Sequence, residues 1–216
     1  MKILRLSLVL LLTTLAARGD LTLVQELRQT GRAESGQVTM KIKGTLIRSD
    51  VNPDMSVIIN TTTGETTSLM HQQKVAMKIP GSVIQAAQAQ AAAQMGKDTP
   101  QPKPTGLTDE INGFACEQYT FVHDGRPMEI WVTKDLKNAA DIFAQLAKLA
   151  PQMNPMGNTF QNTLIDGFPV KTVADMGNGE KFSMTLVSVS EAGLPDSDFK
   201  APKDYKPVEM PKIPGQ

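Results

Sequence analysis

The stretch Gln37–Leu46, QVTMKIKGTL, indicates the fold class of this chain. Its even-numbered positions are Val, Met, Ile, Gly and Leu, whereas its odd-numbered positions are only Gln, Lys or Thr. Side chains along a β-strand point alternately to the two faces of a sheet, so this pattern is typical of a strand with one apolar and one polar face.

Similar alternation elsewhere predicts about nine strands in all. The further strands are expected at Leu21–Arg28, Met55–Ile59, Leu69–His71, Lys74–Ile79, Phe114–His123, Pro127–Thr133, Pro169–Met176 and Lys181–Val189. Asp124-Gly125 and Asn178-Gly179 separate the last two pairs, and such dipeptides favour tight hairpin turns. The strands should therefore pair mostly as antiparallel neighbours.

Two helices are predicted between the strands. Ser82–Met95 is rich in Ala and Gln, which favour helix, and is followed by a glycine. The second predicted helix begins at Asn138, ends at Ala150 and carries one apolar stripe, made of Ile142, Phe143, Leu146 and Leu149. The segment 97–106 contains three prolines, so it is predicted to be a long, extended loop inside the same domain.

The order of these elements is that of an α+β fold with one large antiparallel sheet. A sheet with one apolar face has to cover that face, and two helices are present to do so. We therefore expect a curved sheet that forms an unclosed, half-open β-barrel covered by the two helices.

Residues 1–19 have the features of a cleaved secretory signal peptide. Lys2 and Arg5 precede an uncharged, mostly apolar run that is too short to remain as a membrane anchor. No cysteine lies near the expected cleavage point, so lipid attachment there is not expected. The sequence thus predicts a single domain, residues 20–216, in the periplasm or secreted.

The composition argues against a nucleic-acid-binding protein. The chain has 22 basic and 22 acidic side chains, and loss of Lys2, Arg5 and Arg18 leaves 19 against 22, a net charge near −3. No basic surplus is left to neutralise phosphates. The single cysteine, Cys116, lies in the apolar positions of a predicted strand, and we interpret it as a buried, inert thiol.

Several stretches occur together in one order along the chain: VTMKIKGTLIR at Val38–Arg48, LMHQQKVAMKIP at Leu69–Pro80, INGFACEQY at Ile111–Tyr119, IWVTKDL at Ile130–Leu136 and FKAPKDYK at Phe199–Lys206. In this order they resemble an uncharacterised exported bacterial domain family. That family is similar to the LolA and LolB lipoprotein carriers and to LppX-type lipid-binding proteins. The resemblance implies a LolA-like unclosed barrel that binds a lipid, an acyl chain or a lipidated protein without catalysis or cofactor, with transient membrane contact.

The ligand-binding hollow would then be formed by the apolar positions of the strands. These are Met40, Ile42, Leu46, Val57, Ile59, Val75, Met77, Met128, Ile130, Val132, Phe182, Met184 and Leu186. The helix residues Ile142, Phe143, Leu146 and Leu149 would act as a lid. Eleven methionines remain after cleavage, and their adaptable side chains suit variable apolar ligands, although they also fill ordinary cores.

Other functions stay open at this point. The same strands could enclose a packed core in an envelope sensor or protein-interaction module that uses its open sheet edges. Met153 and Met156 are a pair of soft sulfur ligands suited to Cu(I), but His71 and His123 are distant in sequence. No metalloprotease, serine-hydrolase or phosphate-binding motif occurs, so we expect no enzyme and no metal site. The sequence gives no indication of the oligomeric state.

Overall fold

The computed structural model describes residues 20–31, 35–86, 102–123, 125–136, 165, 167–177 and 179–209. Twelve strands form one sheet: β1 Leu21–Gln29, β2 Gly36–Lys43, β3 Leu46–Asn52, β4 Met55–Asn60, β5 Thr66–Met70, β6 Val75–Ile79, β7 Lys103–Ile111, β8 Phe114–His123, β9 Arg126–Thr133, β10 Phe168–Gly177, β11 Glu180–Ser190 and β12 Lys206–Glu209. A 3₁₀ helix, η1, occupies Asp196–Phe199.

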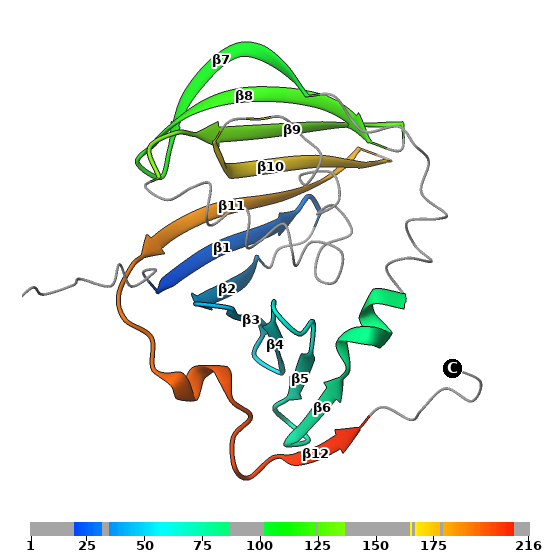
Figure 1. Cartoon of the computed structure of the whole chain (residues 1–216). Coiled ribbons are helices and arrows are strands. Elements are labelled where there is room, and N and C mark those ends of the chain that lie inside the picture. Colours follow the sequence, from blue (N-terminus) through cyan, green and yellow to red (C-terminus); the bar gives the residue numbers. More distant parts are fainter. Residues whose placement is uncertain are drawn as a thin grey trace, which may run out of the picture.

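The sheet consists of two meanders joined by one long-range pairing. The strand order is β12-β6-β5-β4-β3-β2-β1-β11-β10-β9-β8-β7, so β1 to β6 and β7 to β11 are each consecutive neighbours. Pairing of β1 with β11 unites them. The sheet twists strongly, and β7 to β11 run across the view while β5 and β6 run steeply (Figure 1). Its end strands β12 and β7 do not pair with each other, so the predicted curved and unclosed sheet is confirmed.

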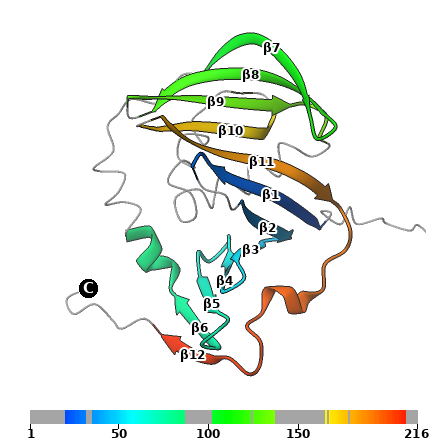
Figure 2. The ribbon, with the colours of Figure 1, turned by 180° about the vertical axis from the view of Figure 1, so that it is seen from behind.

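The prediction of antiparallel pairing holds for every pair of neighbouring strands except one. Strand β12 pairs with β6 in parallel. The chain leaves β11, passes through η1 and returns along β6, as the view from behind shows (Figure 2). We call the segment Leu194–Glu209, which includes η1 and β12, the C-terminal strap.

The predicted two-helix cover is not confirmed. Residues 81–86 form the one α-helix within the described ranges, and they begin the predicted helix Ser82–Met95, whose later residues lie outside those ranges. The second predicted helix, Asn138–Ala150, also lies outside the described residues. Nowhere in the described part is there a helix with the length and apolar character needed to cross a membrane.

Part of the predicted proline-rich loop is a strand. Residues from Lys103 onward belong to β7, which lies at the edge of the sheet and pairs only with β8 in the described structure. An edge strand tolerates Pro104 because the missing N–H can face away from the neighbouring strand. The register of β7 shifts between Pro104 and Thr108, next to Gly106, whose φ is +80°. The irregular pairing explains why no alternation was visible in the sequence.

Candidate functional site: the apolar face of the sheet

The pairing register places the predicted hollow residues on one face of the sheet, with a single exception. Residues that lie opposite each other in neighbouring strands point to the same face. Leu23 lies opposite Met40 and Met184 opposite Thr172, and similar pairs continue across the sheet. We call this face the apolar face, and its predicted members are Met40, Ile42, Val57, Ile59, Val75, Met77, Met128, Ile130, Val132, Phe182, Met184 and Leu186.

Leu46 is the exception, and its predicted place on the apolar face is wrong. The chain turns back at Gly44-Thr45, where Gly44 has a φ of +57°, and Lys43 pairs with Leu46 while Ile42 pairs with Ile47. Ile47 therefore takes the position on the apolar face, and Leu46 packs against a cluster on the other side. The uninterrupted alternation hid this turn, because the glycine falls at an apolar position of the pattern.

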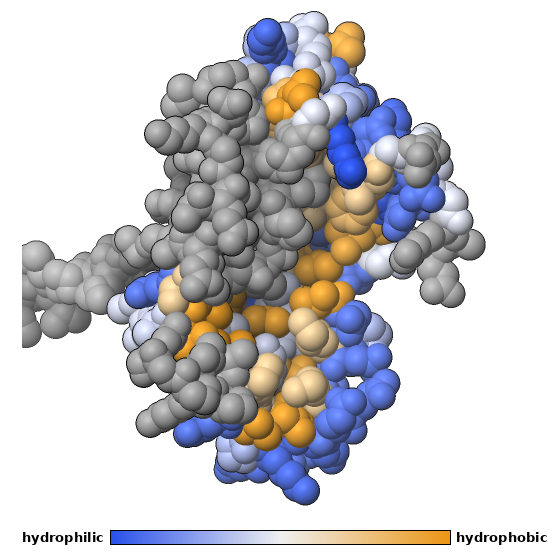
Figure 3. Space-filling model, turned by 90° about the vertical axis from the view of Figure 1, so that its right-hand side faces the viewer, coloured by the Kyte–Doolittle hydropathy of each residue, from blue (hydrophilic) through white to orange (hydrophobic). Residues whose placement is uncertain are grey.

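The apolar face is fully buried at some positions and only half-buried at others. Ile42, Ile59, Ile130 and Leu186 are at most 2% exposed. In contrast, five of the predicted residues keep intermediate exposure: Met40, Val75, Met77, Phe182 and Met184. In the space-filling view, apolar side chains gather in a band that runs from the upper to the lower strands (Figure 3).

The turn between β7 and β8 closes one end of this face. Asn112, with a φ of +51°, donates a hydrogen bond from its side chain to the backbone oxygen of Leu186 at 2.7 Å. The flanking Ile111 and Phe114 pack against the buried cluster that contains Leu23 and Leu186. The hairpin tip is thereby held against β11, so the sheet is partly closed at this end.

The opposite face carries a polar network that holds the C-terminal strap. Lys41 contacts Asp198 at 2.7 Å, and Arg48 donates to the backbone oxygen of the same residue at 2.9 Å. Lys43 forms an ion pair with Asp196 at 2.8 Å. Phe199 is buried on the same face, in a cluster with Ile58, Leu69 and Ala76. Asp196 and Asp198 thus anchor the strap to the sheet.

A second part of the network joins β3, β4 and the turn after β5 to the strap. The Ser56 hydroxyl donates to Asp50 Oδ1 at 2.6 Å, so His71 Nε2, 2.7 Å away, donates to Ser56 Oγ. His71 Nδ1 is then left to accept a hydrogen bond from the Tyr205 hydroxyl at 2.6 Å. Ser56 is 1% exposed, and its proton points to Asp50 rather than to the imidazole. This Asp–Ser–His arrangement therefore fixes the strap and does not present a nucleophile.

The pKa of the Asp50 carboxyl lies below its ordinary value. Burial alone would raise this pKa, but hydrogen bonds from Ser56 and Arg48 and the positive charges of Arg48 and Lys41 outweigh that effect. A carboxyl group with a depressed pKa in the folded state stabilises the protein above its unfolded-state pKa, and this stabilisation disappears as the pH falls through the folded-state value.

We therefore expect acid to destabilise the protein partly through Asp50. Between about pH 5 and pH 2, the free energy of unfolding should fall more steeply for the wild type than for Asp50→Asn, which has no carboxylate to protonate. Urea unfolding across this pH range measures the slope. The control is Asp204→Asn, because Asp204 pairs with Lys74 at the surface and exposed pairs contribute little. Equal slopes for the wild type and Asp50→Asn would contradict the expectation.

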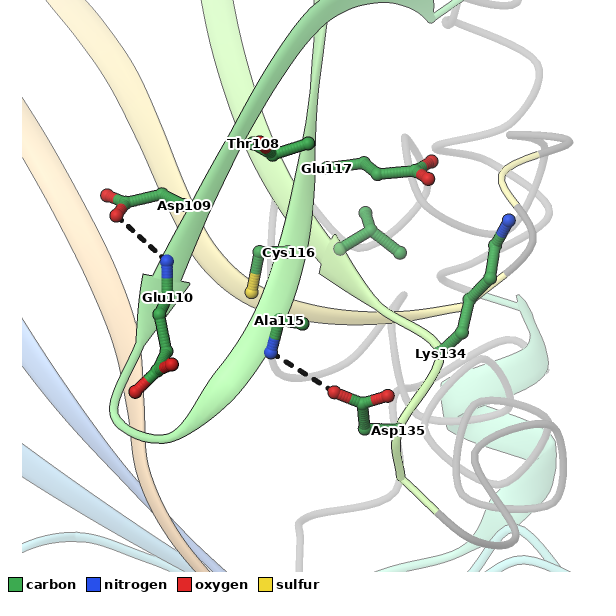
Figure 4. Close-up of a pocket in the computed structure, with 9 residues that line it drawn as sticks. Thr108, Asp109, Glu110, Ala115, Cys116, Glu117, Lys134 and Asp135 are labelled. Carbon is green, nitrogen blue, oxygen red and sulfur yellow. Dashed lines mark hydrogen bonds between the residues drawn. The ribbon is translucent and has the colours of Figure 1, made fainter.

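A separate groove of about 540 Å³ lies along the ends of β7, β8 and β9. Its lining combines four carboxylates with one lysine, the single cysteine and three other side chains, and consists of Thr108, Asp109, Glu110, Ala115, Cys116, Glu117, Val132, Lys134 and Asp135 (Figure 4). Cys116 is buried, as predicted, and burial together with the nearby negative charges of Asp109 and Asp135 raises the pKa of its thiol. The thiol therefore stays protonated near neutral pH and is a poor nucleophile.

The structure does not describe the residues of the alternative metal site or of the predicted lid. Among the residues that the structure describes, no group of three or more His, Cys, Asp or Glu is arranged to hold a metal ion. Met153 and Met156 of the proposed copper pair fall outside the described ranges. The predicted lid residues Ile142, Phe143, Leu146 and Leu149 fall outside them as well.

Three solved structures are similar to parts of this chain at low sequence identity. PNGF-II is 15% identical over 89% of this chain, which spans only 31% of that protein, with a TM-score of 0.45. A LolA superfamily protein from Nitrosomonas europaea is 9% identical over 84% of this chain and 90% of its own length, with a TM-score of 0.34. A DUF1329 family protein from Desulfovibrio piger is 11% identical over the same shares, with a TM-score of 0.35. All three TM-scores are below 0.5, so none of these proteins assigns a function.

No curated protein matches the chain. A family profile does match, and it covers residues 22–205, from β1 to Tyr205 in the C-terminal strap. The match thus includes both meanders and the polar network, and the earlier resemblance to an uncharacterised domain family is confirmed. The chain belongs to the family described as a domain of unknown function, DUF4412.

Proposed function

We propose that this protein is an exported, non-catalytic carrier or chaperone that binds an acyl chain of a lipid or a lipidated protein on the apolar face. One observation carries the proposal: apolar side chains lie along one face of the sheet from β6 to β9, and half-buried Met40, Met77, Phe182 and Met184 are among them. Export rests on the signal-peptide features of residues 1–19.

Binding would be driven by transfer of the acyl chain out of water. Each methylene group that becomes buried contributes about 0.8 kcal/mol, so even partial burial of a long chain offsets the entropy lost on association. Methionine suits such a surface because its unbranched side chain adopts several shapes at little cost. The half-buried methionines would therefore move aside, while buried positions such as Ile59 and Leu186 keep the sheet rigid.

In this mechanism one face of the sheet would hold the C-terminal strap and the other would bind the ligand. Ion pairs and hydrogen bonds from Lys41 and Arg48 hold the C-terminal strap on one face. That face is occupied by the chain's own residues, including buried Phe199. The apolar face would then be the one that accommodates a ligand.

A tryptophan on the apolar face should block binding without unfolding the protein. We expect Met184→Trp to weaken binding of a fluorescent C16 fatty acid at least tenfold, because the indole would fill space that the acyl chain needs. The midpoint of thermal unfolding should change by only a few degrees, since the half-buried methionine has room to be replaced. Fluorescence titration and thermal denaturation of residues 20–216 measure the two effects.

The matched control is Val122→Trp. Val122 is 62% exposed on β8 and lies next to Phe121, so it points away from the apolar face. This variant should bind the fatty acid like the wild type. If Met184→Trp instead causes a large loss of stability, the apolar face is a packed core and the proposal is wrong.

A second function, a protein-interaction module or envelope sensor, is supported by the free edge of the sheet. Strand β7, Lys103–Ile111, is the edge strand of the described sheet and is exposed over almost its whole length. An exposed edge accepts an added strand from a partner protein. Native mass spectrometry of protein purified from a bacterial periplasm separates the two functions: a retained lipid supports the carrier, and a retained protein without lipid supports the interaction module.

A further inference from the structure

Two hydroxyl groups are buried in the apolar face without a hydrogen-bond partner. Ser49 is 1% exposed and Thr172 is 2% exposed. Within the described part of the chain, Ser49 Oγ and Thr172 Oγ1 are the two buried side-chain oxygen or nitrogen atoms for which no partner is found. Buried hydroxyls are normally paired, so two unpaired ones on the same face require an explanation.

The pairing register gives these hydroxyls closely similar surroundings. Ser49 lies between Met40 on β2 and Val57 on β4. Thr172 lies between Ile130 on β9 and Met184 on β11. Each hydroxyl thus has an uncharged apolar residue on one side and a half-buried methionine on the other. Movement of that methionine would open the hydroxyl to a ligand.

We propose that Ser49 and Thr172 each donate a hydrogen bond to the carbonyl oxygen of an acyl ester. This inference rests on the proposed function and narrows the ligand from any apolar chain to an acyl ester. A hydroxyl with no other acceptor gains a hydrogen bond from a carbonyl, whereas a pure hydrocarbon would leave it unpaired.

The surroundings favour a neutral ester over a free carboxylate. The cross-strand neighbours of both hydroxyls carry no positive charge, so a carboxylate would lose its hydration without gaining a cation. An ester carbonyl carries no net charge, so moving it from water onto the apolar face costs much less free energy than moving a carboxylate.

The two hydroxyls act as separate contacts. Strands β3 and β10 are four positions apart in the sheet, which corresponds to roughly 20 Å at about 4.8 Å per strand. One carbonyl group cannot reach both side chains, so each hydroxyl marks its own carbonyl position. Removing one hydroxyl should therefore leave the other contact available to a ligand.

The test compares two probes that differ in one carbonyl group. The probes are 1-palmitoylglycerol, an ester, and 1-O-hexadecylglycerol, its ether analogue, and calorimetric titration of residues 20–216 gives both affinities. We expect the wild type to bind the ester about three- to tenfold more tightly than the ether. The double variant Ser49→Ala with Thr172→Val should lose this preference while binding the ether as well as the wild type does.

A conservative variant and the thermal stability separate recognition from a structural effect. Thr172→Ser keeps the hydroxyl and should keep the preference for the ester. Removing unpaired hydroxyls should leave the thermal midpoint unchanged or raise it. Equal wild-type affinity for ester and ether would overturn this inference and leave the proposed function intact. Failure to bind either probe would overturn the proposed function itself.

Discussion

Replacing Leu186 by alanine should lower the free energy of unfolding by about 2–5 kcal/mol. Leu186 is 0% exposed and lies in the largest buried cluster, together with Leu23 of β1 and Val170 of β10. It is on β11, the strand that joins the two meanders by pairing with β1. Truncation there would leave a cavity at the junction on which both halves of the sheet depend.

The matched control is Leu107→Ala, which removes the same atoms from an exposed site. Leu107 is 57% exposed on the edge strand β7, so its truncation should change stability by less than about 0.5 kcal/mol. Urea unfolding of both variants gives the comparison. A small effect at Leu186 would mean that the surrounding side chains collapse into the space, and that the junction is more adaptable than its burial indicates.

Alanine at Gly81 should destabilise the protein by about 3 kcal/mol, the upper part of the range for overpacked sites. A Cβ atom at this position would lie 2.1 Å from the backbone oxygen of Thr63 and 3.0 Å from Gly64 Cα. Residues 81–86 form a helix, in which alanine is otherwise favoured by about 1 kcal/mol over glycine. The clash should outweigh this gain, because its contacts are backbone atoms that no side-chain rotation can move.

The turn that faces Gly81 has little freedom to retreat. Asn60 accepts hydrogen bonds on its side chain from the backbone of Thr62 and Thr63, and its backbone oxygen accepts one from Gly64. Gly193→Ala is the control, because a Cβ there meets no atom within 4 Å. The midpoint of thermal unfolding should be clearly lower for Gly81→Ala than for the wild type and almost unchanged for Gly193→Ala. A stabilised Gly81→Ala variant would show that the turn moves.

The strands that follow strict alternation could be predicted from the sequence, and the others could not. Phe114–His123 was predicted with its observed bounds, because the dipeptide Asp124-Gly125, which favours a tight turn, marks its end in the sequence. Strand β3 was missed because its buried positions include the polar residue Ser49. Strand β7 was missed because an irregular edge strand with prolines has no buried face to impose a period.

The candidate site, like the fold, could be predicted from the sequence only in part. Local periodicity was enough to group the apolar residues of five strands, β2, β4, β6, β9 and β11, and it failed at Leu46, where a turn exchanged the two faces. The contact of His71 with Ser56 and Tyr205 had no local signal, since its partners lie 15 and 134 residues away along the chain. Only pairing in three dimensions could reveal that network.

The sequence by itself determined which residues are apolar, how they alternate and where the turn-favouring dipeptides stand, because these properties depend on neighbours a few residues apart. The tertiary structure alone decided that β1 pairs with β11, that the C-terminal strap covers one face, and that Ser49 and Thr172 are buried without partners on the other. Those features depend on residues far apart in the chain, and folding brings them together through many weak contacts that no short pattern encodes.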